Sequence, residues 1–152
     1  MKKIMLAVTA VFVSAALFAQ NATQQKKAED VVKFKELTYN FGKIKQNAPV
    51  NHDFVFSNTS DKPVIIESAT PSCGCTTPVF PQAPVAAGKA DKITAGFNAA
   101  AAGPFNKTIT VKVAGIDAPL EIRITGDVLT ADDYAKFEKE KGSKTSKTGG
   151  NK

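Results

Sequence analysis

Short runs in which apolar and polar residues alternate occupy the middle of the chain. Alternation with a period of two places the apolar side chains on one face of a β-strand. In residues 50–56, Val50, Phe54 and Phe56 would share such a face. The continuous β-branched run at residues 64–66 is typical of a strand that is covered on both sides or lies in a sandwich core. The pattern predicts an all-β protein.

About seven such runs occur within roughly 100 residues, and this spacing predicts an immunoglobulin-like β-sandwich in a single domain over residues 31–130. All eight prolines lie between Pro49 and Pro119, where they would interrupt a helical body. Four of them fall in residues 71–84. Because proline donates no hydrogen bond to a ladder, that segment should be irregular or form a sheet edge.

The two ends of the chain differ from this middle part. Residues 1–19 combine a basic start, an apolar run and a small final residue, which is typical of a cleaved secretory signal peptide. The run is shorter than the ~20 residues that span a bilayer, so we expect no transmembrane anchor in the mature chain. Residues 20–30 predict a linker, residues 131–141 a short helix closing the domain, and residues 142–152 a disordered Lys-rich tail.

Net charge changes this picture little. The 20 basic and 14 acidic residues give a formal charge of +6. Lys2 and Lys3 leave with the signal peptide, and residues 139–152 hold five Lys and one Glu. Residues 20–138 therefore balance 13 basic against 13 acidic residues. A neutral domain that is exported to the periplasm or beyond is not expected to bind nucleic acid.

Three stretches carry a resemblance to a known family: residues 39–44, residues 54–59, and residues 71–78 with their Ser-Cys-Gly-Cys-Thr segment. Gly88, residues 93–97, residues 103–105 and residues 124–128 follow in the expected order. Together they resemble the bacterial domain-of-unknown-function family 1573 over about residues 32–129. The resemblance implies an immunoglobulin-like fold, related to the domains of hydin and major sperm protein, and an exported location. It implies no reaction.

Cys73 and Cys75 carry the most distinctive chemistry. Cα atoms two residues apart can lie within the ~4.4–6.8 Å of a disulfide, and Gly74 removes a steric obstacle. Such a small ring would be strained and easily reduced. Two thiolates could instead bind Cu(I), with His52 as the single imidazole of the chain. The third interpretation is structural: the pair pins a Pro-rich segment against the sandwich.

No catalytic constellation is visible. A Cys–His dyad would need a third, orienting group. His52 is in phase with Phe54 and Phe56, so a packed imidazole is the simpler interpretation. Ser72, Gly74, Thr76 and Phe80 could form a partner-binding patch beside the cysteines, although Phe80 could equally cap the core.

Taken together, these features predict an exported, non-enzymatic immunoglobulin-like binding or scaffold module of the bacterial cell envelope. Its expected partner is another envelope protein, its oligomeric state stays open, and no cofactor is expected. The alternative is a thiol-dependent redox or Cu(I)-binding protein that acts through Cys73 and Cys75.

Overall fold

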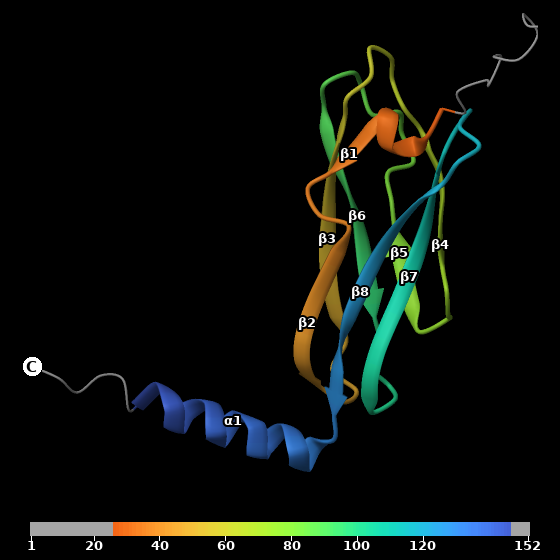
Figure 1. The fold of residues 1–152 in the computed structure, drawn as a ribbon. Helices are drawn as coiled ribbons and strands as arrows, with labels where there is room; N and C mark the ends of the chain where they lie inside the picture. The colour runs from red at the N-terminus through yellow and green to blue at the C-terminus, as the bar shows by residue number, and fades with distance from the viewer. Residues whose placement is uncertain (1–25, 147–152) are drawn as a thin grey trace, which may run out of the picture.

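A computed structural model describes residues 26–146, so the predicted signal peptide, residues 1–19, lies outside this range. The described chain is mostly β (Figure 1). A short 3-10 turn, η1 (Ala28–Asp30), precedes the strands, and a helix, α1 (Ala131–Ser146), follows them. The strands are β1 (Val32–Phe34), β2 (Thr38–Lys45), β3 (Val50–Asn58), β4 (Ile66–Pro71), β5 (Thr76–Val79), β6 (Ala90–Phe97), β7 (Gly103–Val113) and β8 (Leu120–Leu129).

The strands form two packed four-stranded sheets, in the orders β1-β3-β6-β5 and β2-β8-β7-β4. All neighbours pair antiparallel except β2, which runs parallel to β8. This is the constant-type immunoglobulin arrangement, provided that β1 and β2 count as two halves of one first strand. The expected immunoglobulin-like sandwich of about seven strands is confirmed.

The first strand is divided because the chain leaves one sheet and joins the other between Phe34 and Thr38. A bulge follows within β2, between Asn40 and Lys43. Gly42 has φ +67° there, a left-handed conformation that glycine adopts without steric cost, and its N–H donates to Asn40 Oδ1 at 2.7 Å.

The core lies between the inner faces of the two sheets. Phe54 and Phe56 of β3 are completely buried, and Val50 packs against the core from the same strand, as the alternation predicted. The other completely buried large side chains come from β6, β7 and β8: Ile93, Ile109, Ile122 and Ile124. Burial of each such side chain contributes about 1.5–3 kcal/mol.

Of the two expectations for residues 64–66, a strand covered on both sides is wrong, while a place in the sandwich core holds for Val64 and Ile66. Val64 and Ile66 are buried, but Ile65 is 43% exposed because it points away from the core. Val64 forms an isolated bridge with Val85, and β4 begins only at Ile66. Residues 71–84 were predicted to be irregular or to form a sheet edge, and this is confirmed. Strand β4, which ends at Pro71, is an edge strand of one sheet, and β5 is an edge strand of the other.

Both expected boundaries of the domain move. The linker at residues 20–30 is too long, because Ala28 is buried in η1 and its N–H donates to Ala118 O. Helix α1 extends to Ser146, five residues into the expected tail; residues 147–152 lie outside the described chain. The helix projects away from the sandwich (Figure 1). No helix in residues 26–146 is long and apolar enough to cross a membrane.

Candidate functional site

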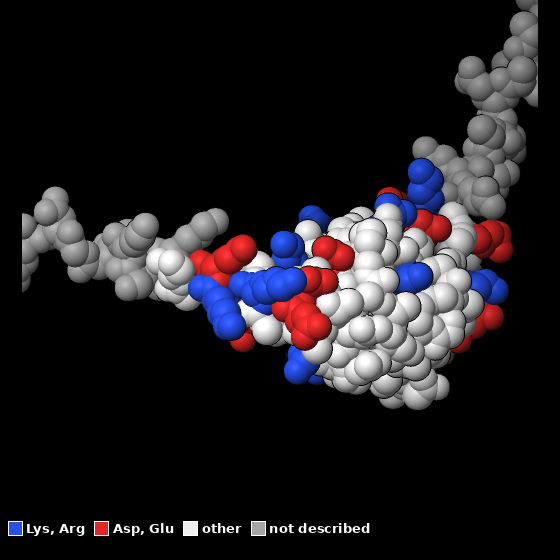
Figure 2. Space-filling view, turned by 90° about the horizontal axis from the view of Figure 1, so that it is seen from below, with Lys and Arg blue, Asp and Glu red and all other residues white. Residues whose placement is uncertain are grey.

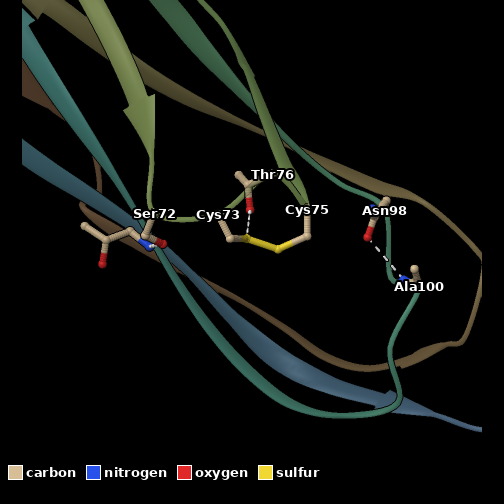
Figure 3. The surroundings of a disulfide bond; sticks show 7 residues. Ser72, Cys73, Cys75, Thr76, Asn98 and Ala100 are labelled. Carbon is tan, nitrogen blue, oxygen red and sulfur yellow. Dashed lines mark hydrogen bonds between the residues drawn. A yellow bond between two sulfur atoms is a disulfide. The ribbon is translucent and has the colours of Figure 1, made fainter.

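The Cys73–Cys75 pair lies where the chain crosses from one sheet to the other. Strand β4 ends at Pro71 as the edge of one sheet, and β5 begins at Thr76 as the edge of the other. The two cysteines form a disulfide across this short crossing, with their Cα atoms 5.4 Å apart (Figure 3). The disulfide is therefore the interpretation that the structure supports, and it closes the turn that joins the two layers.

Backbone hydrogen bonds hold this turn to both sheets. On the β4 side, Ser72 N–H donates to Thr108 O at 2.8 Å, and Thr108 N–H donates to Ser72 Oγ at 3.1 Å. On the β5 side, Asn98 N–H donates to Cys75 O at 3.1 Å. The turn is thus anchored at both ends, and the disulfide constrains the residues between the anchors.

The structure separates the four residues of the expected partner-binding patch. Ser72 and Gly74 are exposed at the turn. Thr76 is only 2% exposed, and its Oγ1 lies 3.8 Å from Cys73 Sγ, so its side chain is not available to a partner and its place in the patch is corrected. Phe80 is half-buried and packs against the core, which is the capping role that the sequence left open.

The outer edge of β5 presents no free N–H group. Cys75 O accepts from the N–H of Asn98, the residue that follows β6, so alternate residues Thr77 and Val79 face β6, while Thr76 and Pro78 face outward. Thr76 N–H donates back to Cys73 O within the turn at 3.3 Å, and Pro78 has no N–H. A partner strand would therefore find no N–H donor along the outer edge of β5, which disfavours recognition by strand addition at this edge.

Residues from four of the stretches that carried the family resemblance pack together near this turn. Phe105 stacks on Phe97 with ring centroids 4.1 Å apart, and its centroid lies 6.4 Å from that of Phe41. Gly126 faces the Phe105 ring and Gly42 O so closely that a Cβ would lie 2.7 Å and 2.9 Å from them. Sequence reasoning could align these residues with a family but could not place them together, because they come from four strands.

Three stretches of the sequence that contribute to the turn and its surroundings contain no charged residue. Residues 46–52, 68–88 and 93–106 contain no Asp, Glu, Lys or Arg, in a chain that is 22% charged. We call their exposed part near the disulfide the uncharged end; its residues are Asn47, Pro49, Ser72, Gly74, Asn98, Ala100, Ala101 and Ala102. Figure 2, which looks at this end, shows charged side chains on α1, at its base and around the rim of the domain, and a broad area between them that is mostly uncharged.

His52 lies away from any group of metal ligands. Its imidazole stacks on the Tyr39 ring with centroids 3.5 Å apart, and its Nε2 lies 2.9 Å from Glu36 Oε1. It therefore ties the crossing between β1 and β2 to β3, as a packed side chain. Residues 26–146 contain no cluster of three or more His, Cys, Asp or Glu side chains that could hold a metal. With both sulfurs in the disulfide, the two-thiolate Cu(I) site does not form in this state.

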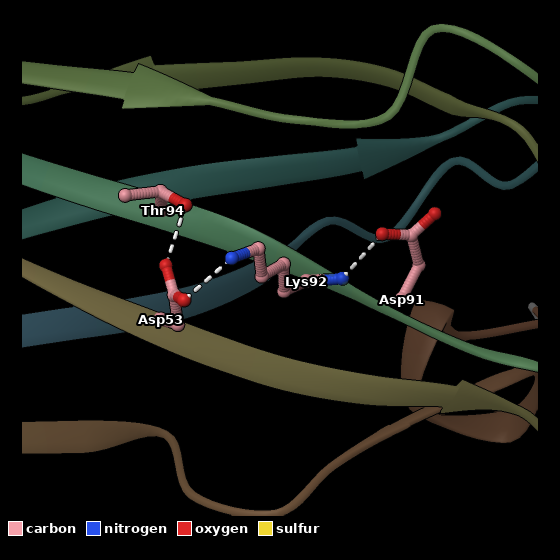
Figure 4. A network of polar contacts seen from close by, with 4 residues as sticks. All are labelled: Asp53, Asp91, Lys92 and Thr94. Carbon is pink, nitrogen blue, oxygen red and sulfur yellow. Dashed lines mark hydrogen bonds and ion pairs between the residues drawn. The ribbon is translucent and has the colours of Figure 1, made fainter.

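The outer face of the β3–β6 pair carries a separate polar network (Figure 4). Lys92 Nζ donates to Asp53 Oδ2 and Thr94 Oγ1 donates to Asp53 Oδ1, both at 2.6 Å. The hydrogen bond from Lys92, followed by that from Thr94, lowers the pKa of Asp53 below its ordinary value. All three side chains satisfy one another at the surface, which is the arrangement of a structural network and offers no general base.

Solved structures share this fold at low sequence identity. A PapD-like domain of human CEP192 has a TM-score of 0.56 and 11% identity over 66% of this chain and 87% of that chain. A protein of unknown function from Porphyromonas gingivalis W83 has a TM-score of 0.55 and 12% identity, over 64% of this chain and 46% of its own. The VesB protease of Vibrio cholerae has a TM-score of 0.52 and 15% identity, over 66% and 33%.

These likenesses show the fold alone, and in the last two proteins the matched part is less than half of a longer chain. The likeness to a protease therefore brings no catalytic residues to this chain. No curated protein sequence matches the chain. The family comparison reaches further, because it matches residues 32–128, most of the sandwich. The chain belongs to the family described as Protein of unknown function (DUF1573).

Proposed function

We propose that the protein is an exported, non-enzymatic immunoglobulin-like module of the bacterial cell envelope, and that it binds another envelope protein through its uncharged end. The observation that carries this proposal is the clustering of uncharged, exposed residues around a disulfide-closed turn. Charged residues are depleted at the centres of protein interfaces, because burying a charge without a partner is costly.

Two features support export. The sequence of residues 1–19 is that expected of a signal peptide, and a disulfide persists in oxidising compartments such as the periplasm. A binding role is supported by the architecture, since the rigid sandwich presents loops that a partner can contact without rearranging the core.

Site-directed crosslinking in the envelope fraction tests the proposal. A photoreactive side chain at Ser72 or Ala100 should yield one defined crosslinked protein, whereas the same group at Thr59, at the opposite end, should not. Introducing a charge with Ala100→Glu should abolish that crosslink, while Thr59→Glu should leave it unchanged. Equal crosslinking from Ser72 and Thr59 would contradict the proposed surface.

The second candidate is the thiol-dependent role, favoured by the placement of both half-exposed cysteines at this end. The combined Cys73→Ser and Cys75→Ser variant separates the two candidates. If the folded double variant still yields the crosslink, the disulfide serves only to shape the surface. If the folded double variant loses the crosslink while Ala100→Glu keeps it, the thiol-dependent role stands. Copper retained by the reduced protein would then identify that role as metal binding.

A further inference from the structure

The other end of the sandwich contains a cavity that the proposed function does not use. It opens between η1, the loop from β3 to β4 and the turn from β7 to β8, and its volume is about 260 Å³. It precedes β4, whereas the disulfide follows β4, so the two features lie at opposite ends of that strand. Figure 1 shows η1 and the β7–β8 turn together at this end.

The floor of the cavity is apolar. Val31, Val64, Val113 and Ile116 line it and are each at least nine-tenths buried. Ile65, which the sandwich core leaves 43% exposed, forms one wall. Because its side chain is exposed, Ile65 extends the apolar surface of the cavity from its floor to its mouth. An occupant would gain about fourfold in affinity for each methylene that it buries here.

Two lysines make the lining of the cavity positively charged. Lys26 and Lys62 line the cavity, and no Asp or Glu does. Within residues 26–146 neither ammonium group takes part in an ion pair. The Ser60 hydroxyl, also in the lining, is already engaged by Asn58 Oδ1 and Lys62 O. The unmatched positive charge beside an apolar floor complements a ligand with one anionic group and one apolar chain.

We propose that this cavity binds a medium-chain fatty acid, with its carboxylate between Lys26 and Lys62 and its acyl chain against Val64, Val113 and Ile116. The volume lies just below the about 300–1,000 Å³ of pockets that hold drug-sized molecules, so it suits a short unbranched chain. This site is independent of the uncharged end, and its occupancy requires no partner protein.

A chain-length series tests the proposal on the full chain. Amide shifts in NMR spectra should saturate at the cavity residues on addition of hexanoate or octanoate, with affinity rising about fourfold per methylene. Octan-1-ol, which lacks the charge, should bind more weakly than octanoate. Lys26→Gln and Lys62→Gln should each weaken octanoate by up to about fivefold, whereas Lys33→Gln, on β1, should change nothing.

Ile65→Asp provides a variant that keeps the fold, because Ile65 is exposed, and it should abolish octanoate binding by placing a carboxylate in the wall. Three results would overturn the proposal: no saturable shifts at the cavity, equal affinity for octan-1-ol and octanoate, or equal effects of Lys33→Gln and Lys62→Gln. Tighter binding of acetyl-Val-Leu than of octanoate would also overturn it, and would assign the cavity to a peptide carboxylate.

Discussion

Among the glycines of residues 26–146, Gly126 has the least room for a side chain. A Cβ at this position would lie 2.7 Å from two atoms of the Phe105 ring and 2.9 Å from the carbonyl oxygen of Gly42. The ring could move only by disturbing its stacking on Phe97, and the carbonyl belongs to the β2 bulge. The glycine thus lets an aromatic ring and a backbone bulge from the same sheet approach one another.

We predict that Gly126→Ala lowers the free energy of unfolding by about 1–3 kcal/mol, the usual cost of overpacking a core. Urea denaturation followed by circular dichroism measures the change. Gly74→Ala is the matched control, because no atom lies within 4 Å of its Cβ and its φ is not positive; it should change the free energy by less than about 0.5 kcal/mol. Equal losses in the two variants would contradict the packing explanation.

Two neighbouring side chains stabilise the charged form of Asp53. Hydrogen bonds from Lys92 and Thr94 lower the pKa of its carboxyl in the folded protein below the ordinary value of about 3.9. Because the folded state favours the charged form, this carboxylate stabilises the protein above the pKa of the unfolded chain. The stabilisation is lost as the pH falls through the folded pKa.

The Asp53→Asn variant should therefore lose less stability than the parent protein on acidification below about pH 4. Its free energy of unfolding should fall less steeply as the pH decreases. The pKa itself is measured by NMR titration of the Asp53 carboxyl carbon. Asp61→Asn serves as the control, since its carboxylate makes no hydrogen bond or ion pair within the described chain. An Asp53 pKa at or above the ordinary value would refute the role of Lys92 and Thr94.

At the scale of elements, β5 is an edge strand without outward donors. Pro78 removes one N–H and the disulfide-closed turn uses that of Thr76, although Val79 nearby is 67% exposed. An exposed apolar edge is a hazard for pairing between molecules, and proline at an outward position is one of the devices that suppress it.

Pro78→Thr should restore an outward N–H while leaving the ladder to β6 intact, and should promote self-association through this edge. Sedimentation velocity over a concentration series would detect the larger species. Pro63→Thr, in a loop outside the strands, should sediment like the parent protein. The explanation fails if Pro78→Thr also sediments like the parent at every concentration.

At the scale of the whole molecule, α1 is attached to the sandwich by few contacts. Lys43 Nζ lies 5.0 Å from the centre of the Phe137 ring, and Tyr134 and Phe137 are its only half-buried residues among 131–143. An exposed cation–π contact contributes about 0.5–1 kcal/mol. The sandwich should therefore hold most of the stability of the chain.

A chain that ends at Thr130 should keep its free energy of unfolding within about 1 kcal/mol of the full protein, because the contacts of α1 with the sandwich are few and mostly exposed. Chemical denaturation monitored by tyrosine fluorescence near Tyr39 provides the measurement, and Phe137→Ala should account for the whole difference. A loss above about 3 kcal/mol on truncation would mean that α1 belongs to the folding unit.

The local pattern of residues was enough to predict the all-β class, the edge position of the Pro-rich segment and the placement of Phe54 and Phe56 in the core. These properties depend on the period of apolar positions and on the missing N–H of proline, which are local. The family resemblance also came from the sequence, on motifs such as Ser-Cys-Gly-Cys-Thr.

Only the tertiary structure decided which of these residues meet. It split the first strand between two sheets, set Gly126 beneath Phe105, buried Thr76 and left Ile65 to line a cavity. It also brought parts of three uncharged stretches, far apart in the chain, together at one end around the disulfide. Strand pairing and sheet packing join residues that are distant in sequence, so no local pattern contains these contacts; they exist only once the two sheets close on their common core.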